Sequence, residues 1–389
     1  MTFRNGFTSL PLYRFLAPLM RIIVDIRPLL EPRRSGVGTY AAEMVKTLAA
    51  RGTHDYALFA NSRTRDLPPD VPPPSDRVTH RFSRHPNRLL NASFAFFDGP
   101  KVERLAGPAD VVYLPNLNFI ATELPLIVTV HDLSFVRFPH FFSRKQRLWH
   151  TFVNARSMLR KASAVVAVSN HTKQDVIETF GVREDRVIVA SPGVSPTFSP
   201  RSEDELDRIR QKYGLKKPYF LFLGALEPRK NIVGIISAYE RIGADLDLVI
   251  AGGKGWLYEE IFRRAAASPK RGRIRFLGYV DDADKPGLYA AASALVYPSF
   301  YEGFGMPPLE AMAVGTPVVA SHVSSLGEVV ADAGLLIDPY SVDDIADAMS
   351  SVVSDARLAA VLRQRGFERA KRFTWDESAK RLEDLFSAL

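Results

Sequence analysis

The feature that most constrains the fold of this chain is a repeated alternation of short apolar runs with helix-like segments. The runs are rich in Val and Ile, as expected for strands buried on both faces of a parallel sheet. The segments between them, such as GTYAAEMVKTLAARG, have the pattern of amphipathic helices. This alternation favours a doubly wound α/β sheet. In the first half the runs are RIIVDI (21–26), DYALFA (55–60), DVVYLP (110–115), PLIVTVHD (125–132), ASAVVAVS (162–169) and DRVIVASPGV (185–194).

The alternation pauses once and then starts again. The pause is SPGVSPTFSPRSEDE (191–205), which is rich in Pro and Ser and ends in acidic residues, as an interdomain linker would be. A chain of 389 residues also suits two domains. We therefore predict two similar α/β domains facing each other. The second series of runs is YFLFLGAL (219–226), DLVIAGG (247–253), IRFLGYV (274–280), ALVYPS (294–299), TPVVAS (316–321) and GLLIDP (334–339).

From these patterns we expect a first domain over residues 20–197 and a second over 198–373. The final segment, 374–389, has the pattern of an amphipathic helix that either caps the second domain or crosses back onto the first. The stretch 61–90 contains RDLPPDVPPPSDR, with five prolines, and is expected to be an irregular loop.

Residues 1–19 are expected to be an N-terminal extension. The segment is apolar but is interrupted by Arg4, Pro11, Arg14 and Pro18, so it does not read as a signal peptide. It is either a disordered or membrane-touching tail, or is not translated because translation starts at Met20. No run of 18 uncharged apolar residues occurs in the chain, so no membrane span is predicted.

Charge is distributed unevenly along the chain. Residues 1–200 contain 26 Lys and Arg against 16 Asp and Glu, whereas the remainder has a small negative excess. This asymmetry favours an anionic partner for the first half, such as a membrane surface, a phosphorylated lipid or nucleic acid. A solvated basic surface without a partner is the alternative. The absence of cysteine excludes disulfides, thiolate metal sites and cysteine nucleophiles.

The stretch YEGFGMPPLEAMAVGTPVV (301–319) carries more special residues than a plain connection needs. Its prolines and Gly315 predict a short helix over 308–314, with Glu310 in the first turn. The N-terminus of such a helix offers backbone N–H groups to an anion, and Gly303 and Gly305 allow a ligand to approach closely. Glu302 lies outside the helix, so the two glutamates are not expected to act as a paired hydrolase acid and base.

This segment resembles the Glu-x7-Glu motif of retaining glycosyltransferases with the GT-B fold, specifically family 4 (glycosyl transferases group 1). Both glutamates match, and the resemblance extends over nearly the whole chain from Met20. It implies two Rossmann-like domains facing across a cleft. It also implies that Arg229 and Lys230, in LGALEPRKNI, hold the diphosphate of a nucleotide-sugar donor, a role that suits their charges. Donor contacts are then also expected from Gly224, Gly303, Phe304, Gly305 and Glu310, with Glu302 among the catalytic residues.

Three further segments match the family pattern. Gly36 and Gly38 in RRSGVGTY resemble the glycine loop that faces the donor phosphate and the acceptor. His131 ends a strand of the first domain, where the family has a histidine that lies against the transferred sugar. In FLGYVDD the backbone of Tyr279 and Val280 resembles the segment that lines the nucleobase pocket. A glycine turn, AGGKGW (251–256), is expected to be a turn rather than a part of the pocket.

No metal is predicted. The Asp-x-Asp sequences at 245–247 and 282–284 lie at the start of a strand and of a helix, where caps or solvent-facing residues are expected. Arg229, Lys230 and the helix N-terminus would supply the positive charge that Mg²⁺ supplies in other transferases.

The predicted function is that of a nucleotide-sugar-dependent hexosyltransferase that retains anomeric configuration, of the mannosyltransferase type found in lipopolysaccharide and O-antigen biosynthesis. The resemblance favours GDP-mannose as donor and a saccharide or lipid-linked saccharide as acceptor. A cytoplasmic location, in peripheral contact with the inner face of the membrane, fits the mixture of basic and aromatic residues over 141–161. That segment also fits a helix with a buried aromatic stripe. Two alternatives are a nucleotide-sugar epimerase on the same fold, which would bind the donor but form no transfer product, and a nucleic-acid-binding protein, which only the basic first half suggests.

Overall fold

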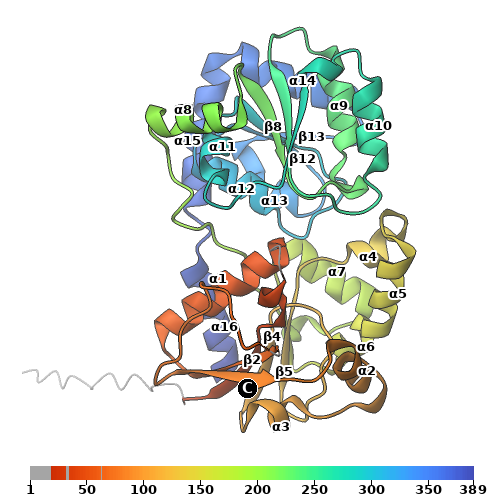
Figure 1. Cartoon of the computed structure of the whole chain (residues 1–389), viewed down its shortest axis with the longest axis vertical. Coiled ribbons are helices and arrows are strands. Elements are labelled where there is room, and N and C mark those ends of the chain that lie inside the picture. Colours follow the sequence, from red (N-terminus) through yellow and green to blue (C-terminus); the bar gives the residue numbers. More distant parts are fainter. Residues whose placement is uncertain (1–18, 32–34, 63) are drawn as a thin grey trace, which may run out of the picture.

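A computed structural model describes residues 19–31, 35–62 and 64–389. The chain forms two α/β domains, one above the other in Figure 1, each built around its own parallel sheet. The predicted N-terminal extension lies outside the described residues, apart from Leu19, as do Arg33 and Arg34 of the predicted glycine loop. Within the described part of the chain, no helix is long and apolar enough to cross a membrane.

The first domain contains a seven-stranded sheet with the order β3-β2-β1-β4-β5-β6-β7, in which all neighbouring strands are parallel. The inner strands are almost wholly buried, because helices cover both faces of the sheet. The strands are β1 (Arg21–Asp25), β2 (Asp55–Asn61), β3 (Val78–Ser83), β4 (Val111–Leu114), β5 (Leu126–Val130), β6 (Ala164–Ala167) and β7 (Val187–Val189). The helices are α1 (Gly36–Arg51), α2 (Asn87–Phe97), α3 (Val102–Ala106), α4 (Ser134–Arg137), α5 (Arg144–Val153), α6 (Ala155–Lys161) and α7 (Asn170–Phe180).

The second domain contains a six-stranded parallel sheet with the order β10-β9-β8-β11-β12-β13. The predicted α/β fold with two parallel sheets is therefore confirmed. The strands are β8 (Tyr219–Leu223), β9 (Asp247–Ala251), β10 (Ile274–Gly278), β11 (Ala294–Tyr297), β12 (Val318–Ser321) and β13 (Leu335–Ile337). The helices are α8 (Glu203–Tyr213), α9 (Ile232–Arg241), α10 (Glu259–Ala267), α11 (Lys285–Ala290), α12 (Met306–Ala313), α13 (Ser325–Val330), α14 (Val342–Ser354) and α15 (Ala356–Ala370).

The prediction of an irregular loop over 61–90 is wrong for its second half. The proline-rich part is irregular, but Val78–Ser83 forms the edge strand β3, and α2 begins at Asn87. The strand pairs with β2 along its whole length and alternates between buried and exposed residues. An edge strand with polar residues on one face lacks the continuous apolar run by which the inner strands were recognised.

The chain passes between the domains twice, and the two crossings lie together. The backbone N–H of Val194 donates to the carbonyl oxygen of Phe373 at 3.1 Å. A Cβ on Gly193 would lie 2.1 Å from the backbone nitrogen of Trp375, so only glycine allows this approach.

The last helix, α16 (Trp375–Ser387), lies beside α1 of the first domain, as Figure 1 shows in blue against red. Arg51 of α1 forms ion pairs with both Glu383, at 2.8 Å, and Asp376. The second of the two alternatives for this segment, a return to the first domain, is the one observed.

Candidate active site

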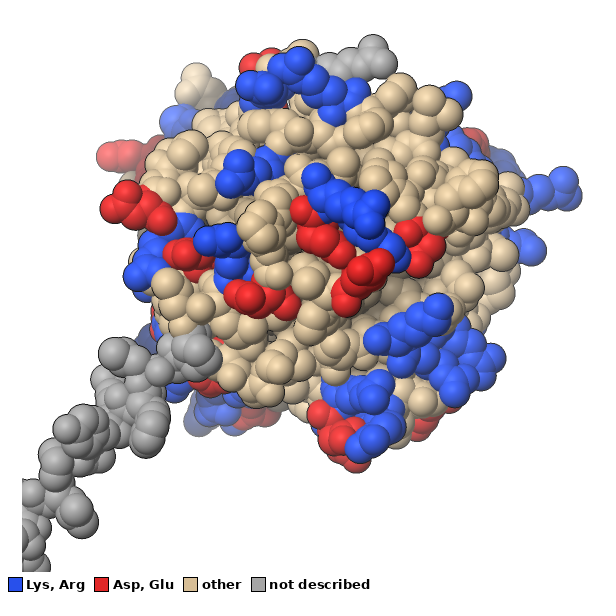
Figure 2. All heavy atoms as spheres, turned by 90° about the horizontal axis from the view of Figure 1, so that it is seen from below, with Lys and Arg blue, Asp and Glu red and all other residues tan. Residues whose placement is uncertain are grey.

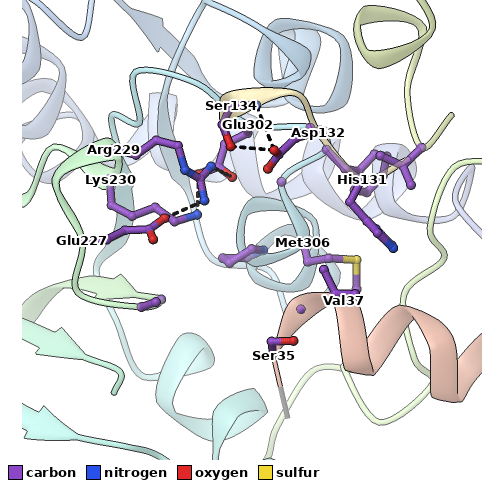
Figure 3. A pocket seen from close by; sticks show the side chains of 18 of the residues that line it. Ser35, Val37, His131, Asp132, Ser134, Glu227, Arg229, Lys230, Glu302 and Met306 are labelled. Atoms are coloured by element: carbon purple, nitrogen blue, oxygen red, sulfur yellow. Dashed lines mark hydrogen bonds and ion pairs between the residues drawn. The ribbon is translucent and has the colours of Figure 1, made fainter. Parts of the chain in front are cut away.

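The candidate site lies between the domains, at the switch point of the second sheet. Where the strand order reverses, the loops after two adjacent strands diverge and leave room for a ligand. Here the diverging loops follow β8 and β11. They border a cavity of about 410 Å³ that extends to the first domain (Figure 3). Predicted site residues in its lining are Gly36, His131, Gly224, Arg229, Lys230, Glu302, Gly303, Phe304 and Gly305.

Four charged side chains of the second domain form a buried cluster on one wall. Lys230 Nζ donates to Glu302 Oε1 at 2.5 Å and to the Tyr297 hydroxyl at 2.7 Å. Arg229 Nη1 donates to Glu302 Oε2 at 2.8 Å, and its Nη2 donates to Glu227 Oε1 at 2.6 Å. Two cations and two anions therefore satisfy one another, in a place where an unpaired charge would be costly.

Because the cluster is buried, its charges shift one another's pKa values. Burial acts to raise the pKa of Glu302, but the adjacent Arg229 and Lys230 outweigh this effect and lower the pKa to about 2. Burial and the neighbouring Arg229 lower the pKa of Lys230, against the opposing effect of Glu302. For Arg229, burial acts to lower the pKa, but Glu302 and Glu227 together raise it well above its usual value.

Two atoms of the cluster make no hydrogen bond within the described part of the chain. Arg229 Nε and Glu227 Oε2 are buried, and neither has a hydrogen-bond partner within the described structure. A buried N–H group without an acceptor is costly, and a ligand oxygen would relieve that cost. Glu227 was not among the predicted site residues. Glu227 immediately precedes the Pro-Arg-Lys segment that resembles the family motif, but a single acidic residue in a loop does not by itself indicate a functional role.

The helix after the Glu-x7-Glu loop differs from its prediction. It spans Met306–Ala313 rather than 308–314, so Glu310 lies in the second turn and not in the first. The two prolines occupy positions 307 and 308 in the first turn and have no N–H group, so this N-terminus offers fewer donors to an anion than was expected. Gly305 precedes the helix with φ +111°, a conformation that favours glycine.

Glu310 does not line the cavity, and its side chain has a partner other than the cations that Glu302 bonds. It is buried and accepts a hydrogen bond of 2.9 Å from the Tyr289 hydroxyl. Burial raises its pKa, although the positive charge of Lys285 and the bond from Tyr289 act in the opposite direction. The two glutamates of one motif thus have pKa values shifted in opposite directions.

The motif loop contacts the first domain directly. The Gly303 carbonyl oxygen accepts hydrogen bonds from Ser169 Oγ at 2.6 Å and Thr172 Oγ1 at 3.1 Å, both at the start of α7. A Cβ on Gly303 would lie 1.6 Å from the carbonyl oxygen of His131. Glycine at this position is therefore required by contact between the domains, in addition to any contact with a ligand.

Two further links hold the domains together near the loop. The Tyr301 hydroxyl donates to Asp175, whose other oxygen accepts from Arg137. Glu328 of α13 accepts from the backbone N–H of Asn170 at 3.1 Å, so it caps the N-terminus of α7 from the opposite domain. No pattern in the sequence predicts the two contacts between the domains, because the residues that they join are more than 120 positions apart.

The first-domain wall of the cavity is aromatic. His131 Nε2 lies 2.8 Å from the carbonyl oxygen of Pro115, which fixes the proton on that nitrogen, and its ring packs edge-on against Tyr40 at 4.8 Å. Burial lowers the pKa of His131, so the ring is neutral near pH 7. Phe135 and His150 stack face to face, with ring centroids 4.0 Å apart, and line the same cavity.

The remaining predicted residues are placed as follows. Gly36 lines the cavity, but Gly38 is buried in the first turn of α1, where its N–H donates to Ser35 Oγ. Tyr279 and Val280 do not line this cavity. Tyr279 borders a separate hollow of about 540 Å³ together with the first-domain residues Ser62, Thr64, Asp66, Leu67 and Pro68, and Val280 is buried.

The glycine turn at 251–256 was predicted to lie outside the pocket. That prediction is wrong for Trp256, which lines the cavity and stacks on Phe142 of the first domain at 5.5 Å.

The two Asp-x-Asp sequences take part in ion pairs. Asp245 contacts Lys217, at 2.9 Å, and Arg273. Asp284 was expected to be a cap or to face solvent. It occupies the N-cap position of α11, but its side chain makes no capping bond: it is buried and bonds to Lys212 and, at 2.8 Å, to the Tyr213 hydroxyl.

Comparison with known proteins places the chain in a family. The model described as Glycosyl transferases group 1 matches residues 205–369, and that of Glycosyltransferase Family 4 matches residues 34–198. The chain is 35% identical over 370 residues to O-antigen chain mannosyltransferase B of Escherichia coli, covering 92% of this chain and 97% of that protein. It is 28% identical to a D-inositol 3-phosphate glycosyltransferase of Salinispora tropica, covering 98% of this chain and 87% of that protein.

Solved structures resemble the whole chain. Sucrose-phosphate synthase from Thermosynechococcus elongatus has a TM-score of 0.74 at 22% identity, covering 94% of this chain and 98% of the other. HepE of Anabaena, in complex with UDP and glucose, has a TM-score of 0.74 at 22% identity, covering 95% and 100%. These likenesses confirm the fold, and the match to the Escherichia coli protein over nearly the full length of both chains settles the family. The chain belongs to glycosyltransferase family 4, the glycosyl transferases group 1.

Proposed function

We propose that this glycosyltransferase transfers mannose from GDP-mannose to a saccharide acceptor in O-antigen synthesis, with retention of anomeric configuration. The observation that carries the proposal is the buried cluster of Glu227, Arg229, Lys230 and Glu302, which faces the cavity at the switch point of the second sheet. Mannose and the O-antigen are favoured by the identity with the Escherichia coli mannosyltransferase.

In this proposal the donor diphosphate binds against Arg229 and Lys230. Both side chains line the cavity, and their positive charges suit the phosphate oxygens of the donor. Glu302 holds both cations in place and prevents their repulsion from opening the site. The cations then stabilise the negative charge that develops on the departing diphosphate, which is the main electrostatic demand of the reaction.

The transfer step needs no strong base from the protein. The bond between the anomeric carbon and the phosphate oxygen breaks while the acceptor hydroxyl forms its bond on the same face of the sugar. The proton of that hydroxyl moves to the departing phosphate oxygen. His131, neutral and with its Nε2 proton held by Pro115, is suited to orient a sugar hydroxyl rather than to remove a proton. The contacts between the domains around Gly303 limit the access of water.

The acceptor is proposed to bind along the first domain, where aromatic side chains line the cavity. Phe135, Phe142 and His150 offer flat apolar faces of the kind on which sugar rings pack. A lipid-linked saccharide fits this arrangement as well as a free one does.

A donor panel tests the proposal. The protein would be incubated with GDP-mannose, UDP-glucose and UDP-N-acetylglucosamine, and release of nucleoside diphosphate would be followed with and without a mannose-containing oligosaccharide. We expect GDP-mannose to bind and turn over, with an α-linked product observed by NMR from an α-linked donor. Turnover of a UDP-sugar in its place would overturn the donor assignment, and an inverted product would overturn the retaining mechanism.

A further inference from the structure

Large apolar side chains exposed to solvent are concentrated on neighbouring helices of the first domain. In the second domain such residues are scattered over separate elements. In the first domain they gather on α2 and α5, where they form what we call the α2–α5 ridge. Its members are Leu89, Phe96, Phe97, Leu148, Trp149 and Phe152. Phe97 has 82% of its surface exposed, which is costly for so large an apolar group unless a partner covers it.

The exposed side of helix α5 carries large apolar side chains. Its inward face carries Gln146, His150 and Val153, while Leu148 and Phe152 are exposed on the opposite side. Trp149 is only partly exposed, because its ring packs edge-on against the buried Phe119 at 5.9 Å. A solvent-facing helix surface would normally be polar. The two helices of the ridge are in contact, since the rings of Phe96 and Phe152 meet edge-on at 5.8 Å. The exposed apolar groups therefore form one continuous surface.

Basic residues border this surface without acidic partners. The segment 144–161, which forms α5 and α6, contains no Asp or Glu. No ion pair within the described chain involves its cations, in contrast to Lys212, Lys217 and Arg264 of the second domain. These unpaired cations are Arg144, Lys145, Arg147, Arg156, Arg160 and Lys161. In Figure 2 the charged atoms toward the right edge, the side on which Figure 1 places α5 and α6, are mostly blue.

We propose that the α2–α5 ridge docks onto the surface of an anionic lipid bilayer, with its apolar side chains inserted among the headgroups and its cations on the lipid phosphates. The aromatic and leucine side chains suit the apolar part of that interface, and the unpaired Arg and Lys residues suit its anionic headgroups. A nucleic acid would satisfy the cations, but it would leave Leu89 and Leu148 exposed.

Docking through this ridge fixes where the cavity lies relative to the membrane. His150, on the inward face of α5, lines the cavity, so only the thickness of one helix separates the cavity from the ridge. If the proposed function holds, an acceptor carried on a lipid would reach the site along the bilayer surface.

Vesicle binding tests the ridge without any transfer assay. The full-length protein would be sedimented with vesicles of phosphatidylethanolamine and phosphatidylglycerol, and with vesicles of phosphatidylcholine alone. We expect binding to the anionic vesicles only, weakened by salt. The Leu148→Ser/Phe152→Ser and Arg144→Glu/Lys145→Glu variants should each lower the partition coefficient by about tenfold or more.

A matched control uses the second domain. Val361, Arg357 and Arg363 of α15 are also exposed, and Val361→Ser and Arg357→Glu/Arg363→Glu remove the same kinds of group. Equal losses in the ridge and control variants would overturn the proposal, as would equal binding to both kinds of vesicle. Binding to a DNA duplex that exceeds vesicle binding, and that the ridge variants abolish, would also overturn it.

The outcome is separable from that of the proposed function. The ridge variants should retain nucleoside diphosphate release with a soluble acceptor, which also shows that they fold. If the protein binds vesicles but does not turn over GDP-mannose, membrane docking through the ridge is supported and only the assignment of the donor is refuted.

Discussion

The two walls of the cavity differ in kind. The wall from the second domain is charged, and its two cations and two carboxylates are buried and bonded to one another. The wall from the first domain is mainly aromatic and includes a histidine that burial keeps neutral, although it also contains the carboxylate of Asp132. The positive charge that would meet a diphosphate thus lies on the second domain, and most of the aromatic surface that suits a sugar lies on the first. We therefore propose that the second domain stabilises the leaving group and the first domain positions the sugar.

Replacing Lys230 breaks the charged wall and should have the largest effect. Lys230→Ala removes a buried cation that lies against the proposed diphosphate, and we expect kcat to fall by about 100- to 1000-fold. Steady-state release of nucleoside diphosphate measures the effect. Lys285→Ala is the control, because that lysine lies near Glu310 and does not line the cavity. An equal loss in the control would show that the charged wall has no special role.

Glu302→Gln tests whether the Glu302 carboxylate holds Arg229 and Lys230 in place. The substitution keeps the shape but removes the charge that pairs with both Arg229 and Lys230, and of the ion pairs within the cluster only Arg229–Glu227 remains. We therefore expect about a 100-fold loss of kcat/KM. Glu310→Gln should cost less, since that side chain does not line the cavity. Greater damage from Glu310→Gln would mean that Glu310 makes the donor contact that the family resemblance implies, and that this contact matters more than the support of the cations by Glu302.

The stability of the fold at low pH tests whether Glu302 is paired with the two cations. The pKa of Glu302 is lowered from 4.5 to about 2, so its ionised form stabilises the fold fully above pH 4.5 and this contribution is lost as pH falls toward 2. Denaturant unfolding of wild type should therefore show stability lost in that window. In Glu302→Gln the loss over that window should be smaller. An unchanged pH dependence would contradict the ion cluster.

His131→Ala tests the aromatic wall, with a smaller expected effect. Loss of one neutral contact to a sugar hydroxyl should reduce kcat/KM by about tenfold. Because burial lowers the pKa of His131, wild-type activity should not depend on this group between pH 7 and 8. A rate that rises with protonation of a group near pH 7.5, and that vanishes in His131→Ala, would show that the histidine acts as an acid.

Tyr301→Phe tests the link between the walls and should have the smallest effect. It removes the hydroxyl that donates to Asp175 while leaving the ring in place. We expect a few-fold rise in KM and more hydrolysis of donor in the absence of acceptor, because closure is less stable. Phe138→Leu, which changes a neighbouring ring without touching that hydrogen bond, is the control.

Much of this arrangement was predictable because it depends on local patterns. The buried strands and the two-domain division follow from the apolar runs, whereas Arg229, Lys230 and Glu302 were expected at the site because their segments resemble the motifs of glycosyltransferase family 4. Strand β3 was missed because an edge strand alternates polar and apolar residues. Glu227, Trp256 and the Tyr301–Asp175 bond depend on contacts between distant segments, and no spacing in the sequence encodes those contacts.

The most direct test of the central claim is calorimetric titration of GDP, which carries the diphosphate but no sugar. Wild type, Lys230→Ala and His131→Ala would be titrated under the same conditions, with UDP as the competing nucleotide. We predict that Lys230→Ala weakens GDP binding by about tenfold or more. We expect the His131→Ala variant to bind GDP as tightly as wild type does but to bind GDP-mannose less tightly. Equal weakening of GDP binding by both substitutions would contradict the division of labour between the two walls.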